Sequence, residues 1–298
     1  MKKFIIEPEY NNLKVGEYLK GIKGYSTRNL RNADVYLNGK KVKLDKKIKK
    51  LNRLVVVEKE KGTNIAPIPM DLDIVYEDKN LLIVNKPPQL VVHPTQKKVD
   101  KTLANGIVDY FLKTTGKTVV PRFYNRLDMD TSGLIVITKN AFTQAFLQDK
   151  AKVKKYYQAV VEGIVEKDEF YIERPIGRVG ENIKREELSV EEGGQEAKTF
   201  VKVLKRYPEK NISLIELELF TGRTHQIRVH MKSLNHPILG DATYGNSTDG
   251  IARQMLHAYR LKFTHPISKK DMVVTAPIPE DFKRAAKFAG LDIEKINF

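Results

Sequence analysis

The chain has 298 residues, and its 53 lysines and arginines outnumber its 37 aspartates and glutamates, which gives a formal net charge of +16. This length suits roughly two domains, and so large a positive excess favours a polyanionic partner, nucleic acid before a membrane surface. The absence of cysteine excludes disulfides, iron–sulfur clusters and thiolate zinc sites, and the six histidines form no pair at a spacing familiar from metal sites.

Segments that would carry the chain into or across a membrane are not expected. The amino-terminal apolar run stops at Ile6, before Glu7 and Pro8, and is too short for a signal peptide. No apolar stretch approaches the length that spans a bilayer. We therefore predict a cytoplasmic protein.

Residues 1–64 carry 17 Lys and Arg against 7 Asp and Glu, so +10 of the total +16 lies in this first part of the chain. We predict a separate basic module here, with two short helices, the second capped by Ser26, then a hairpin that turns at Asn38-Gly39 and a strand at 54–57. Such a module would bring four cations onto one phosphate-facing surface: Arg28, Arg31, Lys40 and Lys41. A solvated charged face without a partner is the alternative.

The segment 62–70 contains glycine and prolines and is expected to be a linker, and residues 65–298 are expected to form a second domain. Its apolar and alternating runs predict strands at 72–76, 81–85, 134–138, 155–163, 200–204, 212–219, 255–258 and 272–274. Helices are predicted at 102–112, 141–150 and 281–288, with another that Thr221 caps and that carries Arg223. Residues 176–196 are expected to be an exposed hairpin or a flexible insertion. Because strands dominate, we predict a mixed α/β (α+β) fold with a largely antiparallel sheet.

A charged loop, YNRLDMDTSG at residues 124–133, runs directly into an apolar strand. An acid on such a loop, above all Asp128, is held at the rigid edge of a sheet, where a site that needs accurate placement belongs. Asp128, Asp130 and Ser132 also match the opening of an EF-hand loop, but the twelfth position is Lys139 and no flanking helices are expected, which disfavours calcium. A turn or capping role for either aspartate stays open from the local sequence.

Three segments agree, in order, with the motifs of one family. They are RLDxxTSG at 126–133, YxAxVxG at 157–163 and LxTGRxHQIR at 219–228. Together they resemble the motifs of the RluA/RluD-type pseudouridine synthases, and further blocks extend the likeness over most of the chain after the linker. Asn125 departs from the family pattern, which has histidine more often at this position. Residues 1–64 resemble the αL RNA-binding motif shared by a small-subunit ribosomal protein and the tyrosyl-tRNA synthetases.

The resemblance implies isomerisation of uridine to pseudouridine in structured RNA, with large-subunit ribosomal RNA, free or in an assembling subunit, ahead of transfer RNA. Asp128 matches the catalytic aspartate, which acts on the sugar either by attacking it or by removing a proton from its 2′ carbon. Arg223 matches the arginine that pairs with this aspartate. Arg126 matches the residue that contacts RNA where the base has left its stack, and Tyr157 matches the residue that packs on the extruded base. No metal and no cofactor are implied, and we expect a monomer.

Two alternatives stay open at this point. The basic module alone would also suit a noncatalytic RNA-binding or ribosome-assembly protein, in which Asp128 is dispensable. A hydrolase could instead use Asp128 and Asp130 as a carboxylate pair and would release free uracil. His225 and His230 receive no chemical role, because histidines in such positions are more often capping or core residues.

Overall fold

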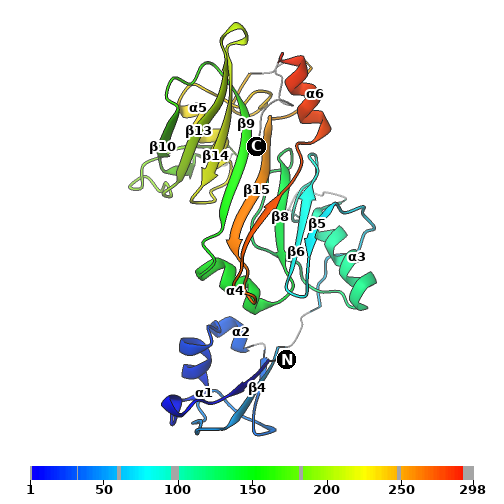
Figure 1. Ribbon diagram of the computed structural model, residues 1–298, viewed down its shortest axis with the longest axis vertical. Coiled ribbons are helices and arrows are strands. Elements are labelled where there is room, and N and C mark those ends of the chain that lie inside the picture. The colour runs from blue at the N-terminus through cyan, green and yellow to red at the C-terminus, as the bar shows by residue number, and fades with distance from the viewer. Residues whose placement is uncertain are drawn as a thin grey trace.

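The computed structural model describes residues 2–31, 33–58, 62–94, 101–180, 184–246 and 250–290, except for the side chains of Arg28, Glu58 and Phe288. A small amino-terminal unit lies at one end of an elongated molecule, and a larger unit built on one long sheet forms the rest (Figure 1). Among the described residues, no helix is long and apolar enough to cross a bilayer.

The amino-terminal unit is a four-stranded antiparallel sheet, in the order β1-β4-β2-β3, with short helical segments beside it. Its elements are β1 (Lys2–Ile5), a 3-10 turn (Pro8–Tyr10), α1 (Val15–Glu17), a π turn (Tyr18–Ile22), α2 (Thr27–Arg31), β2 (Ala33–Leu37), β3 (Lys40–Lys41) and β4 (Arg53–Glu58). Asn38 and Gly39 have φ angles of 51° and 83°, as a two-residue hairpin turn requires, so the hairpin prediction is confirmed. An apolar cluster around the fully buried Tyr18 holds the unit together.

The larger unit is built on a ten-stranded sheet. Its order is β10-β13-β14-β9-β15-β8-β6-β5, with β16 beside β15 and β7 beside β8, and β8 and β15 form the one parallel pair recorded among the described strands. These strands are β5 (Ile74–Glu77), β6 (Leu81–Lys86), β7 (Arg122–Phe123), β8 (Ser132–Thr138), β9 (Lys154–Glu162), β10 (Glu169–Glu173), β13 (Lys198–Tyr207), β14 (Ile212–Leu219), β15 (Leu256–Thr264) and β16 (Asp271–Thr275). The predicted mixed α/β fold with a largely antiparallel sheet is confirmed.

The central strand β8 is buried on both sides. Ile135 and Ile137 belong to the larger apolar cluster, whereas Leu134 and Val136 belong to a second cluster that includes Leu147 of α4. Because neighbouring residues of a strand point to opposite faces, this double burial makes β8 a rigid support for the loop before it. The helices of the larger unit are α3 (Leu103–Thr115), α4 (Ala141–Asp149), α5 (Gln226–Ser233) and α6 (Glu280–Phe288), with a 3-10 turn at Pro208–Lys210.

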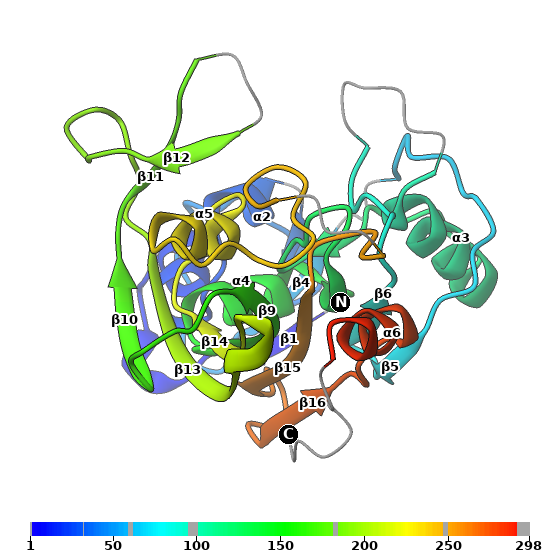
Figure 2. The same cartoon turned by 90° about the horizontal axis from the view of Figure 1, so that it is seen from above.

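A two-stranded ribbon projects from the body of the larger unit (Figure 2). It pairs β11 (Ile176–Arg178) with β12 (Arg185–Glu187) in antiparallel register. The hairpin predicted at 176–196 is therefore confirmed for the described residues of that segment.

Candidate active site

A pocket of about 620 Å³ lies beside the amino-terminal end of β8. It brings together segments that are far apart in the sequence, from the loop before β8, from β9 and from the start of α5. Four residues singled out from the sequence line it: Arg126, Asp128, Tyr157 and Arg223. The motifs that are separate in the sequence therefore share one cavity.

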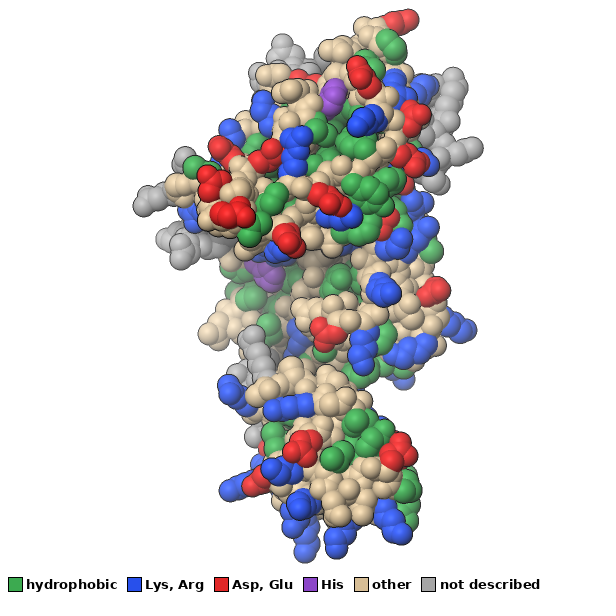
Figure 3. Space-filling view, turned by 90° about the vertical axis from the view of Figure 1, so that its left-hand side faces the viewer, with side chains coloured by type: hydrophobic (Ala, Val, Ile, Leu, Met, Phe, Trp, Pro, Cys, Tyr) green, Lys and Arg blue, Asp and Glu red, His purple; other side chains and the backbone are tan. Residues whose placement is uncertain are grey.

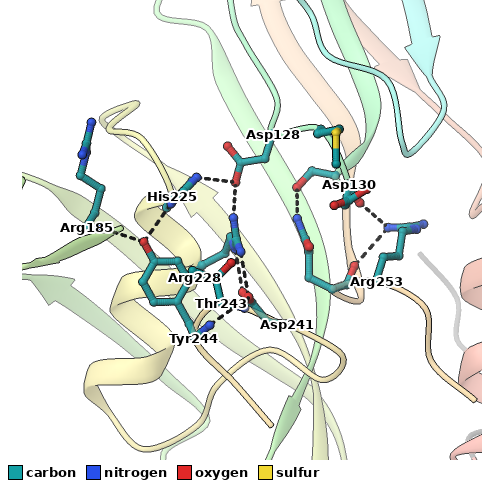
Figure 4. Close-up of polar contacts among 12 residues, drawn as sticks. Asp128, Asp130, Arg185, His225, Arg228, Asp241, Thr243, Tyr244 and Arg253 are labelled. Carbon is teal, nitrogen blue, oxygen red and sulfur yellow. Dashed lines mark hydrogen bonds and ion pairs between the residues drawn. The ribbon is translucent and has the colours of Figure 1, made fainter. Parts of the chain in front are cut away.

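The loop that carries Asp128 is held by two basic side chains, of which Figure 4 shows Arg253 beside Asp130. The ammonium of Lys86 donates to the carbonyl of Met129 at 2.9 Å, and Nη1 of Arg253 donates to the carbonyl of Asp130 at 3.0 Å. Nη2 of Arg253 also donates to the hydroxyl of Ser132 at 3.2 Å. Lys86 is the last residue of β6 and Arg253 lies just before β15, so the position of the loop is determined by the surrounding sheet.

Gly133, the last residue of the motif, is required by a close crossing of strands. Its φ is +120°, in the region that favours glycine, and β15 runs beside it with Ala258 opposite. A Cβ atom on Gly133 would lie 2.2 Å from the carbonyl oxygen of Ala258. Only a residue without a side chain lets β15 approach the end of the Asp128 loop this closely.

Arg228 joins two aspartates at the floor of the pocket. Its Nη1 donates to Oδ2 of Asp128 at 3.1 Å, while Nε and Nη2 donate to the two carboxylate oxygens of Asp241 at 2.7 and 2.8 Å. Burial by itself would raise the pKa of Asp241, but the hydrogen bonds from Arg228 and from the N–H groups of Thr243 and Tyr244 outweigh it and leave this pKa below its ordinary value. Asp241 therefore stays ionised and fixes the guanidinium that faces Asp128.

The prediction that Arg223 pairs with Asp128 is wrong: Arg228 is the arginine that contacts this aspartate. Arg223 is exposed, and its guanidinium donates to the carbonyl of Glu196 at 2.9 Å and to the side chain of Gln195 at 3.1 Å. The expected helix also begins later than predicted, at Gln226, so Arg223 lies in the turn before it. Arg228, the third residue of α5, is buried and turned towards the interior.

The turn before α5 is held by a buried amide rather than by a threonine cap. The side chain of Gln226 accepts hydrogen bonds from the hydroxyl of Thr221 at 2.8 Å and from the N–H of Arg223 at 3.0 Å. His225 adopts a left-handed backbone with φ 58° at the N-cap position. Thr221 therefore stabilises the turn through a side chain and does not cap the helix.

His225 is a site residue that the sequence did not reveal. Its Nε2 lies 3.9 Å from Oδ2 of Asp128, and its Nδ1 lies 2.8 Å from the hydroxyl of Tyr244. That hydroxyl also accepts the N–H of Arg185 at 2.8 Å, so Tyr244 joins His225 to the described end of the two-stranded ribbon. Burial lowers the pKa of His225, which favours the neutral ring. His230, by contrast, is a core residue, as expected, and contacts Thr199.

Tyr157 forms one wall of the pocket from β9. It is almost fully buried, and burial together with the charge of Asp128 raises the pKa of its hydroxyl, so the ring stays neutral. The rings of His93 and Phe123, which also line the pocket, meet edge to face with centroids 4.6 Å apart. Arg126 is exposed at the rim. The cavity thus combines aromatic walls with one acid, which suits a planar ring on a sugar.

The structure explains the unusual Asn125 and excludes the EF-hand interpretation of the Asp128 loop. Asn125, which departs from the family pattern, accepts the N–H of Val136 at 2.9 Å and donates to the carbonyl of Leu134 at 3.0 Å. It therefore ties the loop to β8. The calcium alternative lacks the helix that should follow an EF-hand loop, because residues 132–138 form strand β8. Among the described residues, no group of three His, Asp or Glu side chains could hold a metal ion.

The chain belongs to the RNA pseudouridylate synthase family, whose sequence model matches residues 80–233. It is 38% identical to the uncharacterized RNA pseudouridine synthase YhcT of Bacillus subtilis, with 80% of each chain covered. It is 44% identical to the ribosomal large subunit pseudouridine synthase D of Neisseria meningitidis, over 77% of this chain and 64% of that protein. The solved structure of human RNA pseudouridylate synthase domain containing 1 is similar, with a TM-score of 0.55 and 28% identity, and covers 70% of this chain and 84% of its own.

The protein is therefore an RNA pseudouridine synthase, an isomerase that acts on RNA. The family resemblance drawn from the three sequence motifs is confirmed. The alternative of a noncatalytic RNA-binding protein is disfavoured, because the matched segment includes the catalytic-motif loop and its pocket.

Proposed function

We propose that this enzyme converts uridine to pseudouridine in large-subunit ribosomal RNA, with Asp128 as its single catalytic carboxylate. The observation that carries the proposal is that, of the described residues lining the pocket, Asp128 alone has a carboxylate. Asp130, two residues later, does not line the pocket, which argues against a hydrolase with a carboxylate pair. Relatives named as ribosomal large subunit pseudouridine synthases support ribosomal RNA as the substrate.

The two oxygens of Asp128 have different surroundings. Oδ2 accepts the hydrogen bond from Arg228 and faces His225, whereas no described residue hydrogen-bonds Oδ1. Oδ1 is thus the oxygen available to the ribose, either to attack C1′ or to take the proton from C2′. In either route the N-glycosidic bond breaks, the uracil turns while bound, and its C5 bonds to C1′. Asp128 is regenerated as its bond to C1′ breaks or as it returns the proton to C2′. C5 loses its proton to water and N1 gains one, so the overall change is an isomerisation.

The target uridine must leave its stack to reach this carboxylate. Unstacking and unpairing cost a few kcal/mol, and packing of the base on Tyr157 offsets roughly 1–3 kcal/mol of this. Arg126, exposed at the rim, is positioned to contact the RNA that the base leaves. A volume of about 620 Å³ falls within the range of pockets that hold ligands of this size.

Residues 1–64 are proposed as an RNA-binding module and 65–298 as the catalytic domain. Basic side chains gather on the amino-terminal unit on the face shown in Figure 3. Arg31 and Lys40 are exposed, Lys41 is exposed but its ammonium lies 2.6 Å from Asp34, and the side chain of Arg28 lies outside the described residues. Arg31 and Lys40 are therefore the cations best placed to meet phosphates.

This module predicts a particular salt dependence of RNA binding. Replacing both Arg31 and Lys40 by glutamine removes two positive charges. The slope of log affinity against log salt concentration should then become shallower by up to about 0.9 for each phosphate contact that is lost. Lys113→Gln is the matched control, because Asp109 already neutralises that lysine at 2.7 Å. An unchanged slope in the double variant would exclude these two residues from the RNA interface.

The catalytic assignment is tested by tritium release from ribosomal RNA labelled at uridine C5. Asp128→Asn, which preserves shape, should abolish release without unfolding the protein, whereas Asp130→Asn should retain it. Equal release by the two variants would defeat the role of Asp128, and free uracil among the products would restore the hydrolase. Mapping pseudouridines across ribosomal RNA with and without the gene tests the substrate.

A further inference from the structure

The strand that carries Tyr157 places a lysine on the same side of the sheet, two residues earlier. Side chains alternate along a strand, so Lys155 and Tyr157 both face the pocket, whereas Lys154 faces the opposite side. Lys155 is paired in register with Leu219 of β14, which also lines the pocket. A lysine is thus part of the pocket wall, and the catalytic scheme above leaves it without a role.

Lys155 is a half-buried cation, and no described residue supplies an anion beside it. Among the described residues, no carboxylate forms an ion pair with its ammonium and no acceptor hydrogen-bonds it, and burial is the one influence that lowers its pKa. Its neighbour Lys154 shows the contrast, because its ammonium lies 3.4 Å from Glu218 and that charge raises its pKa. A half-buried ammonium in a pocket wall with no protein anion beside it attracts a negative group that enters the pocket, so the partner of Lys155 is expected to come from a ligand.

The place of Lys155 indicates which part of a nucleotide it meets. The charged partners of Asp128 are Arg228 and His225, and Lys155 is not among them, so this lysine is not engaged by the acid that works on the sugar. It lies instead beside Gly222, where even an added Cβ would stand 4.0 Å from the ammonium nitrogen. Gly222 is exposed and has no side chain, so the space beside the Lys155 ammonium can hold a bulky group of a ligand. The one fully charged group of the substrate is the phosphodiester, and lysine binds phosphate as a point charge.

We propose that Lys155 binds the phosphodiester next to the flipped uridine and thereby anchors that nucleotide in the pocket. The proposal rests on the function proposed above and adds a residue to it. The target nucleotide would then be held at three points, with its sugar at Asp128, its base against Tyr157 and its phosphate at Lys155. This anchoring would raise the population of the flipped state without touching the reacting atoms.

The test uses the full-length protein and a short RNA substrate in which the phosphate on either side of the target uridine is replaced, in turn, by a neutral methylphosphonate. Lys155→Met should lower kcat/KM by about tenfold or more, the usual range for a hydrogen bond to a charged group, and should reduce the salt slope by about 1. One of the two methylphosphonates should lower kcat/KM of the wild-type enzyme by a similar factor and have no further effect on Lys155→Met. Lys154→Met is the control and should behave like the wild type.

Each outcome of these measurements either supports or overturns phosphate binding by Lys155. If both methylphosphonates lower kcat/KM of Lys155→Met as much as that of the wild type, the lysine does not bind phosphate. A lower kcat with an unchanged salt slope would assign it to a neutral uracil carbonyl and would also overturn the proposal. Lys155→Arg should keep both the salt slope and the sensitivity to methylphosphonate. A wild-type enzyme that makes no pseudouridine in the unmodified RNA would refute the proposed function instead, so the two failures are distinguishable.

Discussion

Replacement of Arg228 by lysine tests whether this arginine positions the catalytic carboxylate. Arg228 makes three charge-assisted hydrogen bonds, at 2.7 and 2.8 Å to Asp241 and at 3.1 Å to Asp128, and its side chain is only 7% exposed. A lysine keeps the positive charge but lacks the planar fork, so it can meet one carboxylate well and the other poorly. Arg223→Lys is the matched control, since Arg223 is exposed and contacts Gln195 and a carbonyl group.

The magnitude follows from the bonds that are lost. A hydrogen bond to a charged group contributes about 1.5–3 kcal/mol, and Arg228→Lys loses two of its three such bonds. Asp241 still has the lysine as a counterion, so the larger penalty of an unpaired buried charge does not apply. We therefore expect a loss of about 3 kcal/mol in the free energy of unfolding. Misorientation of Asp128 by about an ångström should lower kcat by about 100-fold. Arg223→Lys should change the free energy of unfolding by less than about 0.5 kcal/mol.

Urea denaturation measures the stability of the two variants, and tritium release at saturating RNA measures kcat. The expected pattern is a large loss in both quantities for Arg228→Lys and a small change in both for Arg223→Lys. The opposite pattern, with kcat lost only in Arg223→Lys, would refute this reasoning and restore the pairing first inferred from the motif.

Three further predictions concern the support of the catalytic loop. Gly133→Ala should lose about 3–5 kcal/mol of stability in urea denaturation, because it combines an unfavourable φ of +120° with a Cβ 2.2 Å from the carbonyl oxygen of Ala258; an unchanged midpoint would contradict this. Burial lowers the pKa of Lys86 from 10.5, its value in the unfolded chain, to about 7 in the folded protein. Between pH 7 and 10.5, Lys86 is therefore protonated in the unfolded state and neutral in the folded state. The stability of the wild type should therefore rise with pH across that window, by up to about 1.4 kcal/mol per unit relative to Lys86→Met, and parallel curves would exclude the shift. Asn125→Ala should lose about 1–3 kcal/mol, since it leaves two main-chain groups of β8 unpaired, and a neutral effect would show that water replaces them.

Local pattern was sufficient for several elements, whereas the acid was singled out by the resemblance of its motif to a family. The run 134–138 is apolar at every position but its last, which predicts a strand buried on both faces, and β8 is such a strand. Asn38-Gly39 predicts a two-residue turn because both residues tolerate positive φ, and the turn is present. Asp128 and Tyr157 were identified by motifs that extend over only a few residues each, and both line the pocket. These features depend on residues that are adjacent in the sequence, so they can be predicted from the sequence alone.

The partners of these residues depended on the order of strands in the sheet. Arg228 meets Asp128 across 100 positions of the chain, and two arginines five residues apart in one motif could not be told apart until the start of α5 was known. Arg253 reaches the catalytic loop for a similar reason, because β15 lies against β8 in the sheet. The isolation of Lys155 likewise requires knowledge of every group around it. Contacts between distant segments depend on how those segments pack against each other in the folded protein. A short stretch of sequence holds no information about the segments that will surround it.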